Sequence, residues 1–359
     1  MSGTSVKRPH ADVMDELKRR LGAIAGIIPK ARPIIYLDYP MHGNVGDLLI
    51  HAGTDRFFAD HGYDVIGYFS IHEFCLTHRP GRPLVFFKES VRRLDDLVGT
   101  GATIVFHGGG NLGDLYRDYQ MFRELVIARY PEAPTVILPQ SIHFEDSANR
   151  AATARLFAAH RQLYIFARDR DSLDFARNEC GCPAALMPDM AHALWGSLPR
   201  HRGSPDRVLN FRRRDKEAAG GLAEASDTFD WDDLTNAADR GMIRLLRKLQ
   251  SVEFPSRHVV PSHVLWRWYR DHLLRRSVRL VGGHGGIVTD RLHGMILGAL
   301  LAMPVTCEDN SYGKLSRYYR EWFSASDHID HRRRQQTHRA EAAAPETVSA
   351  MGELKHYGT

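Results

Sequence analysis

The segment TDRLHG, residues 289–294, places a permanent cation next to a titratable imidazole. Arg291 and His293 are two positions apart, so in an extended backbone they share one side while Leu292 turns to the core. Gly294 then opens an apolar helix, whose N-terminus adds positive potential. This combination predicts an anion site with a proton donor attached. The alternative is a salt-bridged arginine and a hydrogen-bonded core histidine.

A second basic stretch in the same half of the chain follows another predicted strand. FRRRDKE, residues 211–217, contains the consecutive arginines Arg212, Arg213 and Arg214. Guanidinium groups bind carboxylates and phosphates through two parallel hydrogen bonds. The stretch therefore predicts further contacts to an anion, and the run of three leaves open which arginine faces it.

Glycine-rich stretches follow two predicted strands in the first half. In HGNVGD, the glycines permit a tight turn and Asp47 is placed to cap a helix, although a capped turn is the simpler reading. In HGGGNLGD, three consecutive glycines are costly in entropy unless their N–H groups face an anion or a sugar ring. Neither spacing is that of a dinucleotide site. The candidate residues are Asn44, Gly46, Asp47, Gly108, Gly109, Gly110 and Asn111.

Polar residues also end the next strands of the first half. Gln140 and Ser141 lie in PQS, Arg168 in ARDRDS and Asp189 in MPDMA. Because parallel strands bring their carboxyl ends to one edge, we expect these side chains to form the floor of a polar pocket. No carboxylate cluster suits Mg²⁺, so no metal is expected, although Asp47, Asp114 and Asp189 leave that question open.

Strands alternate with helices in both halves, which predicts parallel sheets covered on both faces. A Gly/Pro/Ser-rich stretch, GSLPRHRGSPDR, separates the halves. We therefore predict an α/β protein with two Rossmann-like domains that face each other across a cleft. The predicted parts are an N-terminal arm and helix (1–32), a first domain (33–200), a second domain (201–324) and a disordered tail (325–359).

Composition narrows the class of protein. The 359 residues are 43% hydrophobic and 25% charged, and no apolar run reaches the length of a membrane-spanning helix. The four cysteines imply neither a disulfide framework nor a zinc site, and no secretory leader is evident, so a cytoplasmic location is expected. The net charge of +5 favours anionic ligands, but the basic residues are scattered, so no nucleic-acid partner is expected.

The motifs in order resemble those of the polysaccharide pyruvyl transferase family. They are GNVGD, HGGGNLGD, LPQS, ARDRDS, MPDMA, R-x-D-K-E from Arg213, and TDRLHG, and the similarity spans roughly residues 34 to 320. The resemblance implies a GT-B-like architecture with an acceptor side in the first domain and a donor side in the second. It implies a bacterial enzyme that moves a pyruvate ketal from phosphoenolpyruvate to an oligosaccharide or lipid-linked repeat unit of an exopolysaccharide or cell wall. It further implies that Arg213 and Arg291 bind the donor and that His293 is the central catalytic residue.

The residues suit that chemistry without a cofactor. Arginines bind both anionic groups of phosphoenolpyruvate, and a histidine beside phosphate can protonate the methylene carbon as general acid. The main alternative is a GT-B glycosyltransferase that uses a nucleotide sugar, although no acidic residue of the second half suits a ribose. Basic residues on the helix 263–281 and on the arm also suggest peripheral contact with the inner leaflet, a plain surface helix being the alternative. The oligomeric state stays open.

Overall fold

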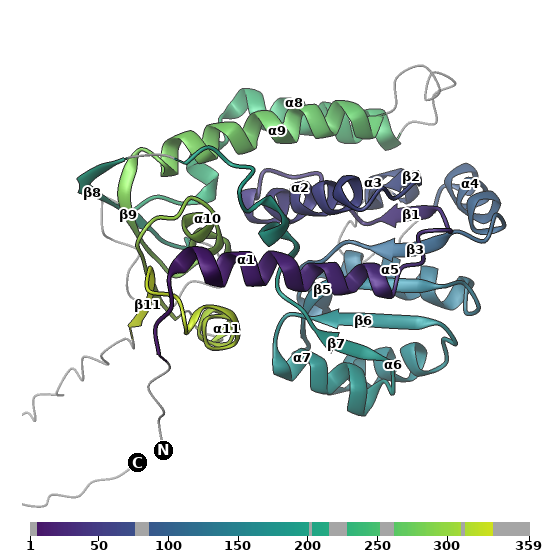
Figure 1. The fold of residues 1–359 in the computed structure, drawn as a ribbon. Coiled ribbons are helices and arrows are strands. Elements are labelled where there is room, and N and C mark those ends of the chain that lie inside the picture. Colours follow the sequence, from purple (N-terminus) through teal and green to yellow (C-terminus); the bar gives the residue numbers. More distant parts are fainter. Residues whose placement is uncertain are drawn as a thin grey trace, which may run out of the picture.

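Two parallel sheets form the frame of the protein in a computed structural model that describes residues 6–75, 86–200, 203–214, 228–251, 262–309 and 313–332 (Figure 1). The larger sheet has seven strands in the order β2-β1-β3-β5-β6-β7, with β4 paired to β5. The smaller sheet has the order β11-β10-β9-β8. The predicted α/β class with parallel sheets is confirmed.

The larger sheet consists of β1 (Ile34–Leu37), β2 (Val65–Phe69), β3 (Thr103–Phe106), β4 (Gly109–Gly113), β5 (Thr135–His143), β6 (Leu163–Ala167) and β7 (Ala184–Leu186), and the smaller of β8 (Ser204–Phe211), β9 (His284–Thr289), β10 (Val305–Glu308) and β11 (Ile329–Arg332). The helices are α1 (His10–Leu21), α2 (Val45–Asp60), α3 (Ile71–Phe74), α4 (Lys88–Val98), α5 (Arg117–Arg129), α6 (Ser147–Ala158), α7 (Arg170–Asp174), α8 (Ala237–Ser251), α9 (Ser262–Val281), α10 (Leu292–Leu300) and α11 (Lys314–Tyr318).

The strand β1 shows why the first-half strands are apolar without alternation. Ile34 and Tyr36 belong to the apolar cluster on one face of the sheet, and Ile35 and Leu37 belong to the cluster on the other. All four side chains are fully buried. A strand with both faces covered by helices has no solvent side, so successive residues are all apolar.

One of these two apolar clusters continues from the larger sheet into the smaller. It joins Leu48 of α2 to Leu209 of β8 and Ile287 of β9. The helix α1 lies along both halves (Figure 1), with Met14 and Leu17 buried in the same cluster. The N-terminal helix that the sequence predicts is thus part of the core.

The glycine stretch 107–114 differs from its prediction as a loop. It contains β4, which pairs with β5. Gly109 and Gly113 have φ angles of 129° and 132°, where other residues are strained. A Cβ atom at Gly113 would collide with the carbonyl oxygen of His143, and one at Gly108 would lie 2.7 Å from that of Pro139. Close backbone approach therefore explains Gly108 and Gly113, and the positive φ angle explains Gly109.

The predicted disordered tail contains a strand. β11 pairs in register with β10, and Ile329 is fully buried. The Lys7 ammonium donates to the carbonyl oxygens of Ser326 and Ile329 at 2.7 and 2.9 Å. The sequence did not predict this strand because its composition is charged. The strand is bound by its pairing with β10 at the edge of the sheet and by one buried side chain, that of Ile329. Residues 333–359 lie outside the described residues.

Three buried histidines make the fold sensitive to acid. Burial, as the largest cause, lowers the pKa of His72 and of His107 to about 3 and that of His192 to about 4. In an unfolded chain they titrate near 6.5. Below about pH 6.5 the unfolded chain therefore binds protons that the folded chain cannot, so the free energy of unfolding falls as the pH falls.

The substitution His72→Leu should reduce this dependence. Nε2 of His72 has no hydrogen-bond partner among the described residues, so leucine forfeits no bond there. We expect the midpoint of urea unfolding to drop less in the variant than in the parent between about pH 7.5 and about pH 5. Equal drops would show that His72 takes up no proton on unfolding.

Candidate active site

A cavity with a volume of about 370 Å³ opens where strand ends from both sheets meet. The segments that follow β1 and β6, together with β4, supply one side, and the segments that follow β8 and β9 supply the other. This is the edge at which parallel sheets bind ligands. The lining residues are His42, Asn44, Asp47, Gly110, Asn111, Tyr116, Tyr119, Arg168, Arg213, Trp231, Arg291, Leu292 and His293.

The helix α2 begins at the wall of this cavity. Asn44 is its N-cap, and its side-chain oxygen accepts from the N–H of Gly46 at 3.1 Å. The predicted cap, Asp47, lies instead in the first turn, with its Oδ2 3.6 Å from Nε2 of His42. The prediction was wrong because Asn44 already occupies the capping position. Asp47 is left to face the cavity.

The helix α10 begins on the opposite wall. Its first residue is Leu292 and its N-cap is Arg291, with φ −96° and ψ 127°. The helix thus starts two residues before Gly294, where the sequence predicted it. Leu292 packs against the core cluster, as expected, and also lines the cavity. Two helix N-termini therefore border one cavity, and both place partial positive charge there.

A buried carboxylate orients the imidazole of His293. Oδ2 of Asp189 lies 3.4 Å from Nε2 of His293 and 2.5 Å from Nη1 of Arg168. Asp189 is fully buried, whereas 15% of the His293 side chain is exposed. Burial alone raises the pKa of Asp189, but the His293 hydrogen bond and the Arg168 charge outweigh it and hold that pKa far below its usual range. Asp189 is therefore a carboxylate at neutral pH.

The other side of the imidazole is set by Gly46 in the first turn of α2. A Cβ atom at this position would lie 2.6 Å from Nδ1 and 2.8 Å from Cγ of His293. Only glycine leaves room for the ring between α2 and Asp189. Gly46 thus shapes the site by its missing side chain and does not itself line the cavity.

Arg291 is held by a carboxylate that the sequence analysis did not single out. Its Nε and Nη2 atoms lie 2.5 Å from Oδ1 and Oδ2 of Asp230. Arg291 is 8% exposed and lines the cavity. This ion pair, with its hydrogen bond from Nη2 to Oδ2, holds the guanidinium group in place and offsets part of its charge. Asp230 also begins the short helical turn Trp231–Leu234.

The three consecutive arginines have different surroundings. Only Arg213 lines the cavity. Nη1 of Arg212 pairs with Glu308 at 2.8 Å, and Arg214 pairs with Asp233. Of the three arginines, Arg213 is thus the one placed to meet a molecule in the cavity.

Several predicted residues support the cavity from behind. Gln140 is fully buried and donates to Oδ1 of Asn111 at 2.6 Å. Ser141 accepts from Nε of Arg168 at 3.3 Å and donates to Asp169 at 2.8 Å. These two residues hold the side chains that line the cavity.

The remaining predicted glycines serve packing. A Cβ atom at Gly294 would lie 2.6 Å from Oγ1 of Thr289 and 2.9 Å from Cδ1 of Phe211. Gly294 therefore packs α10 on its sheet, and Gly108 and Gly109 lie outside the lining set.

Asp114 accepts from the N–H groups of Glu145 and Asp146. Within the described ranges, no three His, Cys, Asp or Glu side chains are grouped to hold a metal ion.

Sequence reasoning missed the aromatic part of the lining and one buried ion pair. Tyr116, Tyr119 and Trp231 line the cavity, and no motif marks them. Below the cavity, Arg123 donates to Oδ2 of Asp38 at 2.9 Å and to Asn111 at 3.1 Å. The one available signal was an aspartate, Asp38, next to the apolar run 34–37 in the sequence.

Comparison with known proteins gives the family of this chain. The family model described as "Polysaccharide pyruvyl transferase" matches residues 44–312. EpsO of Bacillus subtilis (strain 168) is 36% identical over 316 residues, which cover 86% of this chain and 91% of that protein. The chain belongs to the polysaccharide pyruvyl transferase family. The family predicted from the ordered motifs is thus confirmed.

More distant members and a solved structure extend the likeness. Pyruvyl transferase 1 of Schizosaccharomyces pombe (strain 972 / ATCC 24843) is 26% identical over 309 residues, covering 81% of this chain and 70% of that one. The crystal structure of an uncharacterized protein from Klebsiella pneumoniae subsp. pneumoniae NTUH-K2044 matches with a TM-score of 0.52 at 18% identity. That match covers 88% of this chain and 97% of the other, and it shows a shared fold.

The substitution Gly46→Ala should displace the imidazole of this pyruvyl transferase family member. The added methyl group overlaps the His293 ring, so the ring must turn away from Asp189. We expect a loss of about 1–3 kcal/mol in unfolding free energy and a changed ¹⁵N chemical shift for Nε2 of His293.

The matched control is Gly241→Ala, where a Cβ atom meets nothing within 4 Å. The variant should gain up to about 1 kcal/mol in unfolding free energy at this partly exposed helical position and leave the His293 signals unchanged. Unchanged His293 signals in Gly46→Ala would contradict the proposed packing.

Proposed function

We propose that the protein transfers a pyruvate ketal from phosphoenolpyruvate to a sugar of an exopolysaccharide or cell-wall repeat unit in the cavity described above. The observation that carries the proposal is the His293–Asp189–Arg168 chain at a cavity bordered by two helix N-termini and by Arg213. It unites an oriented proton carrier with an anion site, and this reaction requires both.

The donor would lie against the cationic wall of the cavity. Phosphoenolpyruvate has a carboxylate and a phosphate, and Arg213 and Arg168 both line the cavity. The N-termini of α2 and α10 add backbone N–H groups directed at an anion. Arg291 is already paired with Asp230. It would therefore add positive potential to the cavity wall and shape that wall, more than it would form a new bidentate contact with the donor.

The acceptor would enter from the side of the larger sheet. Asn111, Tyr116 and Tyr119 line that wall. Amide groups can bind sugar hydroxyls, and aromatic rings offer an apolar face with a polar end. The two sheets would then be the donor and acceptor sides of a GT-B-like arrangement of Rossmann-like domains, an assignment supported by a cavity that residues of both sheets line.

In the proposed reaction His293 acts first as acid. Its imidazolium gives a proton to the methylene carbon of phosphoenolpyruvate, which becomes the methyl group and leaves C2 electrophilic. A sugar hydroxyl attacks C2, the C2–O bond to phosphate breaks, and a second hydroxyl closes the ketal ring. Of the two hydroxyl protons, one returns to His293 and one leaves on the phosphate. Asp189 stabilises the imidazolium because it stays ionised beside it.

The substitution His293→Gln should abolish this turnover. Glutamine can keep a hydrogen bond to Asp189 but cannot cycle a proton, so we expect phosphate release from phosphoenolpyruvate to fall by about 10²–10⁴-fold. The assay pairs phosphoenolpyruvate with lipid-linked and free oligosaccharide acceptors, and calorimetry with UDP- and GDP-sugars tests the glycosyltransferase alternative. Full activity in the variant, or tight binding of a nucleotide sugar with none of phosphoenolpyruvate, would refute the proposal.

The neighbouring arginines offer a matched pair of variants. Arg213→Gln removes a cavity-lining charge, whereas Arg212→Gln removes one that pairs with Glu308. We expect the KM for phosphoenolpyruvate to rise about 10- to 100-fold in Arg213→Gln, since hydrogen bonds to charged groups contribute about 1.5–3 kcal/mol. Arg212→Gln should leave KM nearly unchanged. Equal effects of the two variants would disprove the assignment of Arg213.

A further inference from the structure

The outer face of the helical hairpin α8–α9 exposes large apolar side chains. Six of the eleven large hydrophobic side chains exposed in the described residues lie on these two helices. They are Met242 (40%), Leu245 (50%) and Leu249 (40%) on α8, and Val264 (48%), Leu265 (39%) and Trp268 (66%) on α9. Such a concentration on one face marks an interaction surface, whereas scattered single residues do not.

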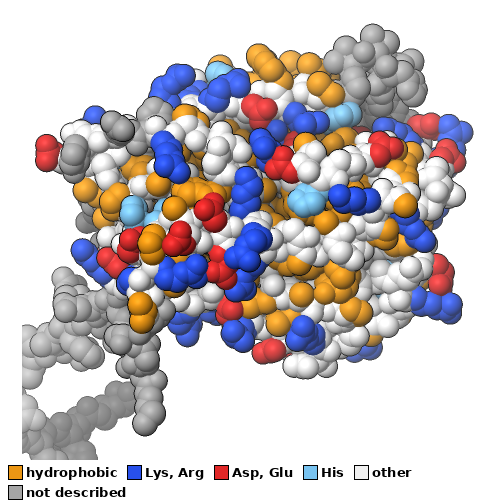
Figure 2. Space-filling view, in the orientation of Figure 1, with side chains coloured by type: hydrophobic (Ala, Val, Ile, Leu, Met, Phe, Trp, Pro, Cys, Tyr) orange, Lys and Arg blue, Asp and Glu red, His pale blue; other side chains and the backbone are white. Residues whose placement is uncertain are grey.

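The packing of the hairpin does not require these side chains. At helical spacing they form one stripe on each helix, while Ile243 and Leu246 of α8 and Trp266 and Leu273 of α9 fill the core. The Tyr269 hydroxyl, which donates to Asp239 at 2.5 Å, ties the two helices side by side. Figure 2 shows hydrophobic side chains along the edge of the molecule where α8 and α9 lie in Figure 1.

The charges on this face have one sign. Every exposed charged residue of the two helices is basic, namely Arg240, Arg244, Lys248, Arg275 and Arg279. Both acidic residues are engaged and are not fully exposed. Asp239 accepts from Tyr269 and Arg276, and Asp271 accepts from Arg270. The exposed charge on the two described helices is therefore positive, and it lies beside the apolar stripes.

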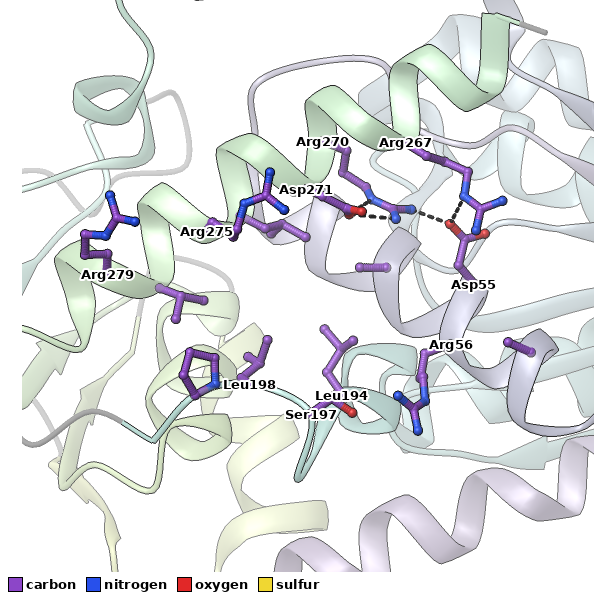
Figure 3. A pocket seen from close by; sticks show the side chains of 15 residues that line it. Asp55, Arg56, Leu194, Ser197, Leu198, Arg267, Arg270, Asp271, Arg275 and Arg279 are labelled. Carbon is purple, nitrogen blue, oxygen red and sulfur yellow. Dashed lines mark hydrogen bonds and ion pairs between the residues drawn. The ribbon is translucent and has the colours of Figure 1, made fainter.

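A groove with a volume of about 560 Å³ runs under α9 beside this face, away from the strand ends (Figure 3). Leu194, Leu198 and Val278 belong to its apolar lining, and Arg275 and Arg279 extend the basic stripe of α9 to its rim. Neither of these two arginines has an ion pair among the residues that the structure describes. The groove thus suits an anionic head group with an apolar tail.

We propose that the α8–α9 face docks on the surface of a membrane that contains anionic lipids. A cationic face with exposed tryptophan and leucine matches such an interface, where the apolar side chains enter the head-group region and the basic ones meet phosphates. A second copy of the chain fits less well, because a symmetric contact would bring like charges together. None of the described helices has the length and hydropathy to cross a bilayer, so the contact is peripheral.

This surface differs from the one that the sequence suggested. The helix 263–281 was expected to act with the N-terminal arm. The apolar side chains of α1, among them Val13 and Leu17, are buried in the core and cannot reach a bilayer. The partner of α9 in this role is α8.

Vesicle flotation of the full chain tests the proposal. The protein should float with vesicles of phosphatidylcholine and phosphatidylglycerol and not with phosphatidylcholine alone. Arg275→Gln/Arg279→Gln should weaken binding about 25-fold, since each basic residue near the surface contributes about a fivefold factor. Leu245→Ser/Trp268→Ser should also weaken it.

Matched controls lie elsewhere on the surface. Leu125→Ser on α5, which is 46% exposed, and Arg155→Gln on α6 should bind as the parent does. Three results would overturn the proposal: no flotation with anionic vesicles, equal effects of hairpin and control variants, or a dimer in sedimentation that Trp268→Ser dissolves while vesicles are not bound. The assay uses neither donor nor acceptor, so its outcome is independent of the proposed pyruvyl transfer.

Discussion

A buried carboxylate, Asp189, joins the two halves of the site. It is fully buried after β7 and pairs with Arg168 of the larger sheet and with His293 at the start of α10. An uncompensated charge at such a depth costs several kcal/mol, so the two halves are held where both partners reach it. The orientation of the imidazole is therefore tied to the packing of α10 against the larger sheet.

Two other buried ion pairs act in the same way around the cavity. Asp230 holds the guanidinium of Arg291, and Asp38 holds Arg123 beneath Asn111. Such pairs add little net stability, because desolvation consumes most of their attraction. Their geometric effect is larger, since each fixes a side chain that lines the cavity or supports one that does.

Local sequence patterns predicted most of the elements and the family. Apolar runs ended by glycine or polar residues marked every strand of the described sheets except β4 and β11. β4 was missed because glycines that permit close strand pairing resemble glycines of a binding loop, and β11 because its composition is charged and a neighbouring edge determines it. The start of α10 was predicted two residues too late. Its N-cap is Arg291, which makes no side-chain capping hydrogen bond, so no capping residue marks the start in the sequence.

By itself, the sequence determined the α/β class, the order of the strands along the chain, and the stretches that carry arginine, histidine and glycine at strand ends. Only the tertiary structure decided that Arg213 and not Arg212 faces the cavity, that Asp189 orients His293, and that the apolar stripes of α8 and α9 stay uncovered. The reason is the separation of the interacting residues along the chain. Spacing reports contacts within a few residues, whereas Asp189 and His293 are 104 positions apart, and only folding brings them together.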